Sequence, residues 1–274
     1  MSAHDLIATA VAVIVLAGVS VGVLRWYGVR ERWATASAIL RGMVQLAVVS
    51  VALTGLITHP GLVLLAVSVM FTVAVGTATR RLAAPGTLWR TAGFVALAIA
   101  SGVVVALGAV FATGALEPTS RYLLALSAIV IGNTMNITTL TGRHLTETLI
   151  ERWDEVEAWL ALGATPRQAS SSMARHAVHS ALVPSIDQTK TTGLVTLPGA
   201  FVGAIFGGLS PVEAGRFQVL VLAALLASGS IAAVVTAQVR ASSPTRPEPL
   251  VSRAENSLMV GGTPLHTWRR CRRS

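Results

Sequence analysis

Long runs of apolar residues are the feature that most constrains what this chain can fold into. Seven segments of 17 to 23 residues are predominantly apolar: Leu6–Leu24, Ala36–Ile57, Gly61–Thr79, Thr91–Ala112, Tyr122–Leu140, Thr192–Gly208 and Phe217–Val239. A helix needs about 20 such residues to cross the hydrocarbon of a bilayer. Backbone groups in lipid must bond within their own segment, which favours helices. We therefore predict an all-α, polytopic membrane protein with about seven transmembrane helices.

Composition agrees with this class and excludes others. Hydrophobic residues make up 53% of the 274 residues and charged residues only 12%, against about 25% charged in soluble domains. The net charge of +9 does not indicate a nucleic-acid partner, because seven of the 21 Lys and Arg residues lie in the last 35 positions and most others flank apolar runs. The single cysteine, Cys271, excludes an intrachain disulfide. The first apolar run has no basic leader, so we expect a retained span and not a signal peptide.

The basic residues predict an orientation. One set of loops carries Arg25, Arg30, Arg32, Arg80, Arg81 and Arg90, whereas the opposite loops carry only Arg121 and Arg216. Lys and Arg are retained on the cytoplasmic side of a membrane. We therefore expect a plasma (inner) membrane protein with its N-terminus outside and its C-terminus in the cytoplasm.

The longest loop between spans is also the most charged. We assign residues 1–240 to a transmembrane domain and residues 141–190 within it to a cytoplasmic coupling segment, because loops of this length are usually functional. The alternative is a solvated helical hairpin that only joins two spans. Residues 241–274 are rich in Pro, Ser and Arg, and we expect a basic, disordered tail that either contacts lipid headgroups or has no partner.

The stretch from Glu155 to Met173 predicts a helix, a break and a second helix. Gly163 suits the left-handed residue that ends a helix. Thr165 suits the N-cap of the next helix and Pro166 its first position. The stretch resembles the coupling helix of ABC-transporter permeases, with Trp159 in place of one alanine. The candidate residues for coupling to an ATPase are Glu157, Gly163, Ala164, Thr165, Pro166 and Gln168.

The chain contains no nucleotide-binding loop of the P-loop type. Such a loop needs a lysine directly after a glycine, and the only lysine, Lys190, follows Thr189. We therefore expect no catalytic residue and no cofactor in this chain. ATP and Mg would belong to a separate ABC-type ATPase subunit.

Several longer motifs resemble one family. The stretches "RGMVQL", "IGNTMN", "LGATPRQA" and "ALVPSIDQTKTTGLVTLPGAFVGAIFGGLSPVEAGRFQ" are similar to the FetB-type family of ABC-transporter permeases, from about Arg41 to Gln218. The resemblance implies export of iron or another metal species, driven by a separate ATPase. Plant relatives imply a nucleotide sugar as the alternative cargo. Family members tend to have two methionines where this chain has Ala200 and Phe201, which weakens an argument for metal contact there.

Polar residues inside the apolar runs are candidates for a translocation path. Arg41 and Gln45 lie one turn apart in the second run, and Asn133 and Asn136 lie three apart in the fifth. A charge near the bilayer centre costs about 2.5–3.5 kcal/mol on insertion scales, so these groups should face protein or water. The alternative is that Arg41 extends to the membrane edge and the asparagines bond between helices.

Asp187 and Lys190 share a helical face and can pair. We interpret this pair, with Pro198, as a junction that passes motion from the coupling segment to the glycine-rich run beyond it. The alternative is a static ion pair.

No metal site is predicted within the spans. The six histidines are His4, His59, His144, His176, His179 and His266, and no apolar run combines them with Asp or Glu. We expect a homodimer, since one chain supplies half a set of helices and one coupling segment. Two rival classes remain: a secondary transporter without an ATPase, and a membrane scaffold without transport.

Overall fold

The computed structural model describes residues 3–28, 32–56, 60–84 and 86–242, and these residues form ten α-helices. They are α1 (Ala3–Trp26), α2 (Arg32–Leu56), α3 (Pro60–Leu82), α4 (Leu88–Ala112), α5 (Ser120–Glu151), α6 (Trp153–Ala161), α7 (Pro166–Ala169), α8 (Ser171–Thr191), α9 (Gly199–Phe206) and α10 (Pro211–Arg240). The chain divides into two compact units, Met1–Val63 and Leu64–Ser274. The predicted tail lies outside the described residues from Ser243 onward.

Six of these helices are long and apolar enough to cross a membrane. They comprise Ile7–Trp26, Trp33–Ser50, Pro60–Leu82, Leu88–Ala112, Ser120–Glu151 and Pro211–Arg240. The all-α, polytopic class is thereby confirmed. In the smaller unit, α1 packs against α2. The described side chains of these two helices are exposed or only partly buried, as expected for helices that meet lipid or other helices.

The predicted span Thr192–Gly208 is wrong. Residues 192–198 form a turn in which Gly193 has φ +86° and its N–H donates to the Thr196 carbonyl at 2.8 Å. Helix α9 begins only at Gly199 and has 8 residues, which is about 12 Å of helix against a hydrocarbon thickness of about 30 Å. Hydropathy alone did not reveal that Gly193 and Pro198 divide the apolar run.

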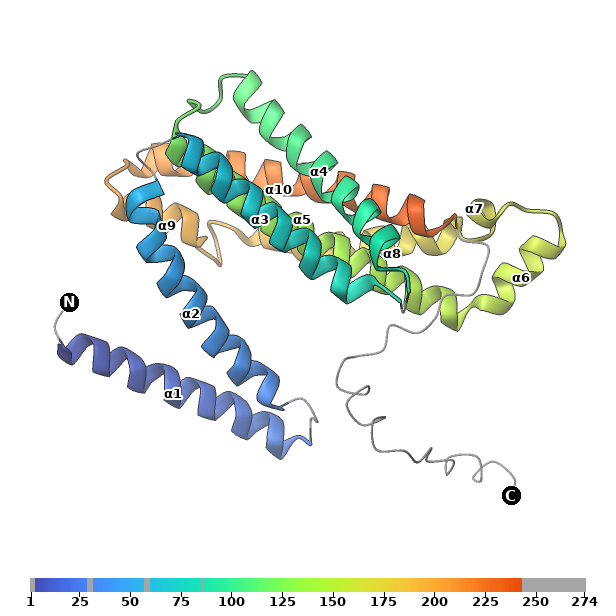
Figure 1. Ribbon diagram of the computed structural model, residues 1–274, viewed down its shortest axis with the longest axis horizontal. Coiled ribbons are helices and arrows are strands. Elements are labelled where there is room, and N and C mark those ends of the chain that lie inside the picture. Colours follow the sequence, from blue (N-terminus) through green and yellow to red (C-terminus); the bar gives the residue numbers. More distant parts are fainter. Residues whose placement is uncertain (1–2, 29–31, 57–59, 85, 243–274) are drawn as a thin grey trace. The chain divides into compact units, whose positions relative to one another are not determined.

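The larger unit is a helical bundle around α10, which packs against α4, α5, α8 and α9 (Figure 1). Small residues allow the closest approach: a Cβ on Gly102 of α4 would lie 2.5 Å from the Ser228 carbonyl oxygen of α10. Such contacts are the usual means of joining helices in a membrane, where lipid is as apolar as leucine. The core is therefore held by fit between backbones as well as by apolar side chains.

Arginines mark the two ends of this bundle. At the first end, named the Arg240 end, the Arg240 guanidinium donates to the Thr146 hydroxyl at 2.7 Å. At the other, named the Arg216 end, Arg216 donates to the Ala115 carbonyl at 3.0 Å. Helices α5 and α10 both run from the Arg216 end to the Arg240 end.

Helix α8 returns along α5 and α10 in the opposite direction. Ser170, just before α8, donates to the Ala241 carbonyl at the Arg240 end. Farther along, Ala181 packs with Ile137 and Ala233, and Ser185 reaches Asn133 near the middle of α5. The structure therefore divides residues 141–190: α6 and α7 lie at the Arg240 end, whereas α8 lies inside the bundle region. With α9, which packs on α10, α8 completes one further passage between the ends.

Candidate coupling elbow and intramembrane polar sites

The break between α6 and α7 has the predicted local geometry. Gly163 has φ +89°, the left-handed conformation that glycine adopts without strain. The Thr165 side chain accepts from the Gln168 N–H, and the Gln168 side chain accepts from the Thr165 N–H at 2.9 Å, which forms a capping box with Pro166 at the first helical position. We name residues 153–169 the elbow.

Apolar side chains are exposed on the elbow. Trp159 is 51% exposed and Leu162 is 81% exposed. Glu157 is also exposed, and its carboxylate accepts from the Trp153 indole N–H at 2.5 Å. Two large apolar side chains beside a sharp break, at the end of a bundle, form a surface suited to a protein partner.

The inner face of the elbow is fixed to the bundle. A buried cluster joins four helices at this end: Leu145 and Leu149 of α5, Trp153 and Val156 of α6, Ala169 of α7, and Met173 and Ala177 of α8. A packed cluster of this kind resists deformation, so the elbow and the first turns of α8 are held together.

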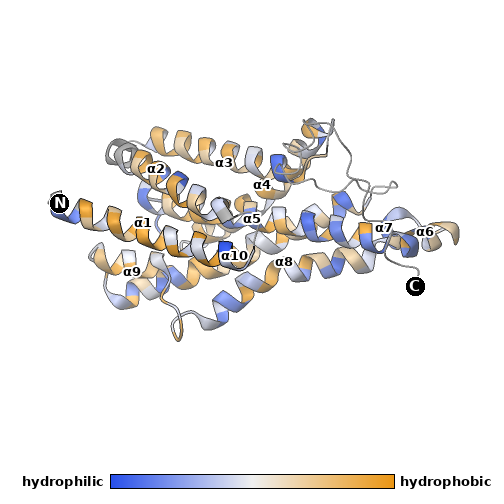
Figure 2. Ribbon diagram, turned by 90° about the horizontal axis from the view of Figure 1, so that it is seen from below, coloured by the Kyte–Doolittle hydropathy of each residue, from blue (hydrophilic) through white to orange (hydrophobic). Residues whose placement is uncertain are grey.

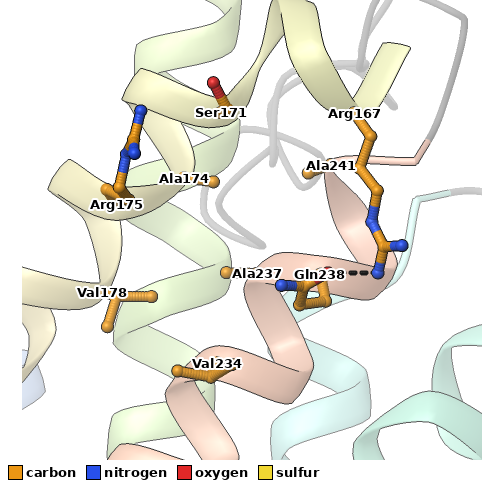
Figure 3. Close-up of a pocket in the computed structure, with 9 residues that line it drawn as sticks. All are labelled: Arg167, Ser171, Ala174, Arg175, Val178, Val234, Ala237, Gln238 and Ala241. Carbon is orange, nitrogen blue, oxygen red and sulfur yellow. Dashed lines mark hydrogen bonds between the residues drawn. The ribbon is translucent and has the colours of Figure 1, made fainter. Parts of the chain in front are cut away.

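A cavity of about 460 Å³ lies between α8 and α10 beside the elbow (Figure 3). Arg167 and Arg175 line it, and Arg167 donates to Gln238. The lining contains no carboxylate. Among the described residues, neither arginine forms an ion pair. The cavity is therefore electropositive.

Asn133 joins three helices at mid-length of the bundle. Its side-chain N–H donates to the Leu225 carbonyl of α10 at 3.1 Å, and its oxygen lies 3.5 Å from the Ser185 hydroxyl of α8. This is the interhelical bonding that the sequence left open as an alternative. Asn136, three residues on, is exposed and does not join this contact.

Arg41 and Gln45 are both exposed on α2. They belong to the smaller unit, and their role in a path stays a prediction.

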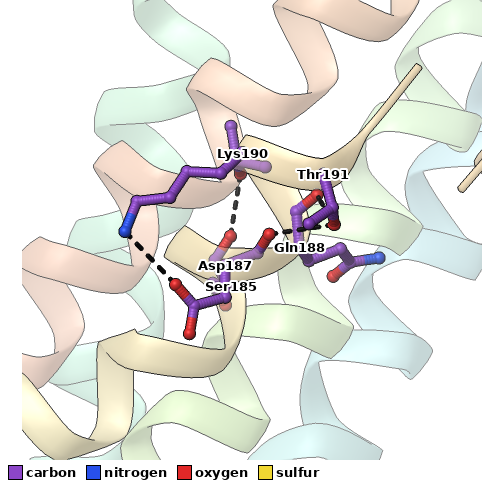
Figure 4. A network of polar contacts seen from close by, with 6 residues as sticks. Ser185, Asp187, Gln188, Lys190 and Thr191 are labelled. Atoms are coloured by element: carbon purple, nitrogen blue, oxygen red, sulfur yellow. Dashed lines mark hydrogen bonds and ion pairs between the residues drawn. The ribbon is translucent and has the colours of Figure 1, made fainter. Parts of the chain in front are cut away.

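The Asp187–Lys190 pair forms as expected. The Lys190 ammonium lies 3.2 Å from the Asp187 carboxylate, and both side chains are largely exposed, at 70% and 60% (Figure 4). Both residues belong to the last turns of α8. Pro198 stands seven residues beyond α8, at the N-cap of α9. The pair therefore lies before the turn at 192–198 and does not itself bridge it.

Sequence reasoning missed two groups. Ser185 was not singled out, because a lone serine carries no signal until α8 is known to reach Asn133. From the sequence, Arg240 is only the last residue of the transmembrane domain, although it contacts Thr146 and the Leu82 carbonyl. No group of three or more possible metal ligands occurs among the described residues.

These features define a class: a polytopic, all-helical membrane protein with an anchored, exposed elbow at one end of its bundle. A family model covers residues 7–243, and the chain belongs to that family, described as the uncharacterised protein family UPF0014.

Three relatives illustrate the family. The UPF0014 membrane protein STAR2 of Oryza sativa subsp. japonica is 35% identical over 201 residues, which cover 73% of this chain and 70% of the relative. The UPF0014 membrane protein YjkA of Bacillus subtilis is 33% identical, covering 72% and 79%. The probable iron export permease protein FetB of Escherichia coli is 32% identical over 142 residues, about half of each chain. No solved structure shows a significant match.

Proposed function

We propose that this chain is the membrane-spanning subunit of an ATP-driven ABC transporter that exports iron or another metal species. The observation that carries the proposal is the elbow, which exposes Trp159 and Leu162 on one face and packs its buried face against α8. The similarity to a relative named as an iron export permease supports the choice of cargo.

A separate ABC-type ATPase would bind the exposed Trp159 and Leu162, and it would hold ATP and Mg. Each chain presents one elbow, so two copies would serve the two ATPase subunits of a homodimeric transporter. In this proposal the Arg240 end and the C-terminus would lie in the cytoplasm, and the N-terminus would lie outside the inner membrane.

Coupling would run through α8. Closure of the ATPases displaces the elbow, the cluster around Met173 transfers the displacement, and α8 carries it to the level of Asn133. Pro184 lies within α8, where proline removes a backbone hydrogen bond and permits bending. The Asp187–Lys190 pair would keep the last turns of α8 intact, so that motion reaches the turn before Pro198 and α9.

Inside-out membrane vesicles containing the chain and its ATPase test the proposal. We expect ATP-dependent uptake of radiolabelled iron citrate that persists when an uncoupler collapses the ion gradients. A variant of the ATPase that lacks its P-loop lysine should abolish uptake.

Other outcomes identify the alternatives. Uptake that needs no ATPase and stops with the uncoupler would indicate a secondary transporter. ATP-dependent uptake of a nucleotide sugar but not of iron would keep the ABC mechanism and replace the cargo.

A further inference from the structure

The exposed face of α8 is polar along most of the helix. The exposed residues spaced three or four apart on this face are Ser172, Arg175, His176, His179, Val183, Asp187 and Lys190. We name this set the α8 stripe. The residues turned toward α5 and α10, such as Met173, Ala177 and Ala181, are buried and apolar or small. Figure 2 shows hydrophilic residues along α8.

The stripe lies alongside α5 and α10, at the depth of the membrane that these two helices would cross. The contact of Ser170 with Ala241 fixes one end of α8, and the contact of Ser185 with Asn133 fixes a point fifteen residues later. Fifteen helical residues rise about 22 Å. The half of the stripe that is farther from the Arg240 end therefore lies well inside the bundle. Asn133 is the fourteenth of the 32 residues of α5.

A face of this composition is incompatible with lipid. Arg, Lys, Asp and His within the membrane face a protein interior or a water-filled cavity, because hydrocarbon cannot solvate them. Nothing in the larger unit covers the stripe, since its described side chains are exposed.

We propose that the α8 stripe is the wetted wall of the translocation path, and that it favours an anionic, oxygen-rich solute such as a metal chelate. The inference rests on the proposed transport function and names the class of its cargo. Arg175 and Lys190 outnumber Asp187 on the stripe. At the Arg240 end, the stripe adjoins the electropositive cavity, because Arg175 belongs to the stripe and also lines the cavity.

Thiol labelling tests the wetted wall, because the only native cysteine can be removed as Cys271→Ser. In that background, Val183→Cys reports on the stripe and Val104→Cys on an exposed apolar face of α4. The two positions lie at similar depth, because Gly102 of α4 meets Ser228 while Leu182 of α8 lies against Gly229.

Open membrane sheets containing the full chain are treated with membrane-impermeant methanethiosulfonate reagents. We expect Val183→Cys to react at least tenfold faster than Val104→Cys. We also expect the anionic sulfonate reagent to react several-fold faster than the cationic ammonium reagent at Val183→Cys. Adding Arg175→Gln, which leaves the Asp187–Lys190 pair intact, should bring that ratio close to one.

Equal, slow labelling rates at both positions would overturn the wetted wall. A copper-catalysed disulfide between two Val183→Cys chains that resist labelling would also overturn it, because it would indicate a dry contact between two copies. A ratio that favours the cationic reagent would overturn the anionic cargo. His179→Cys serves as a second reporter should Val183→Cys fail to fold. Labelling requires no ATPase, so the two proposals can fail separately. If the protein binds no ATPase but Val183→Cys is still labelled fast, the ABC assignment is refuted while the wetted wall is supported.

Discussion

At the scale of single residues, Asn133 shows how a polar group can be stable inside a membrane protein. Its amide is shared among α5, α8 and α10, so the cost of removing it from water is offset by bonds to Leu225 and Ser185. Its neighbour Asn136 is exposed on the single chain. Two asparagines that look alike in the sequence thus have different surroundings.

We predict that Asn133→Ala destabilises the protein more than Asn136→Ala. Loss of an interhelical hydrogen bond in a membrane protein costs about 0.6 to 1.7 kcal/mol, and within the described parts of the chain Asn133 makes one and Asn136 does not. Thermal unfolding in detergent should show a lower Tm for Asn133→Ala. Equal Tm values for the two variants would contradict the three-helix contact.

Gly102 provides a second residue-scale prediction. A Cβ at this position would lie 2.5 Å from the backbone oxygen of Ser228, and backbone atoms cannot rotate away. Overpacking costs about 1 to 3 kcal/mol, so Gly102→Ala should lower Tm by several degrees. Gly108→Ala on the same helix is the matched control, since its Cβ would meet nothing within 4 Å. A Tm for Gly102→Ala like that of Gly108→Ala would show that α4 and α10 are not so close.

At the scale of elements, the elbow was predictable because its signals are local. Gly163, Thr165 and Pro166 each act on one or two neighbouring backbone groups, and the structure has the left-handed residue, the N-cap and the first-position proline where the sequence indicated them. Helix α8 was not predictable in the same way. Its composition is polar on average, so the sequence predicts a helix within a loop between two spans. Only its packing on α5 and α10 reveals where it lies.

The Asp187–Lys190 pair gives an element-scale prediction. The double variant Asp187→Asn with Lys190→Gln removes the ion pair but keeps the size of both side chains. We expect ATP hydrolysis by the assembled transporter to continue while cargo movement per ATP falls several-fold, because the end of α8 would no longer move as a unit. Parallel assays of phosphate release and cargo uptake in proteoliposomes measure both. Unchanged cargo movement per ATP in the double variant would show that the pair is a static contact without a role in coupling.

At the scale of the whole molecule, the membrane class and most spans followed from apolar runs alone. The error fell at residues 192–208, where hydropathy identified an apolar run but not its division into a turn and a short helix. The passage expected there is made by α8 and α9 together, in two pieces. Apolar length predicts a crossing well when one helix makes it, and poorly when a polar helix and an apolar one share it.

The central claim is that the elbow is the docking site of a separate ATPase. The tagged chain is purified in mild detergent from cells that make both proteins, and the amount of copurified ATPase, identified by its P-loop, is measured against the chain. We predict near-equal amounts with the original chain and with Val212→Ala, an 83% exposed site near the Arg216 end. The double variant Trp159→Ala with Leu162→Ala should retain less than a tenth of the ATPase. Absence of any ATPase, or undiminished recovery with the double variant, would contradict the claim.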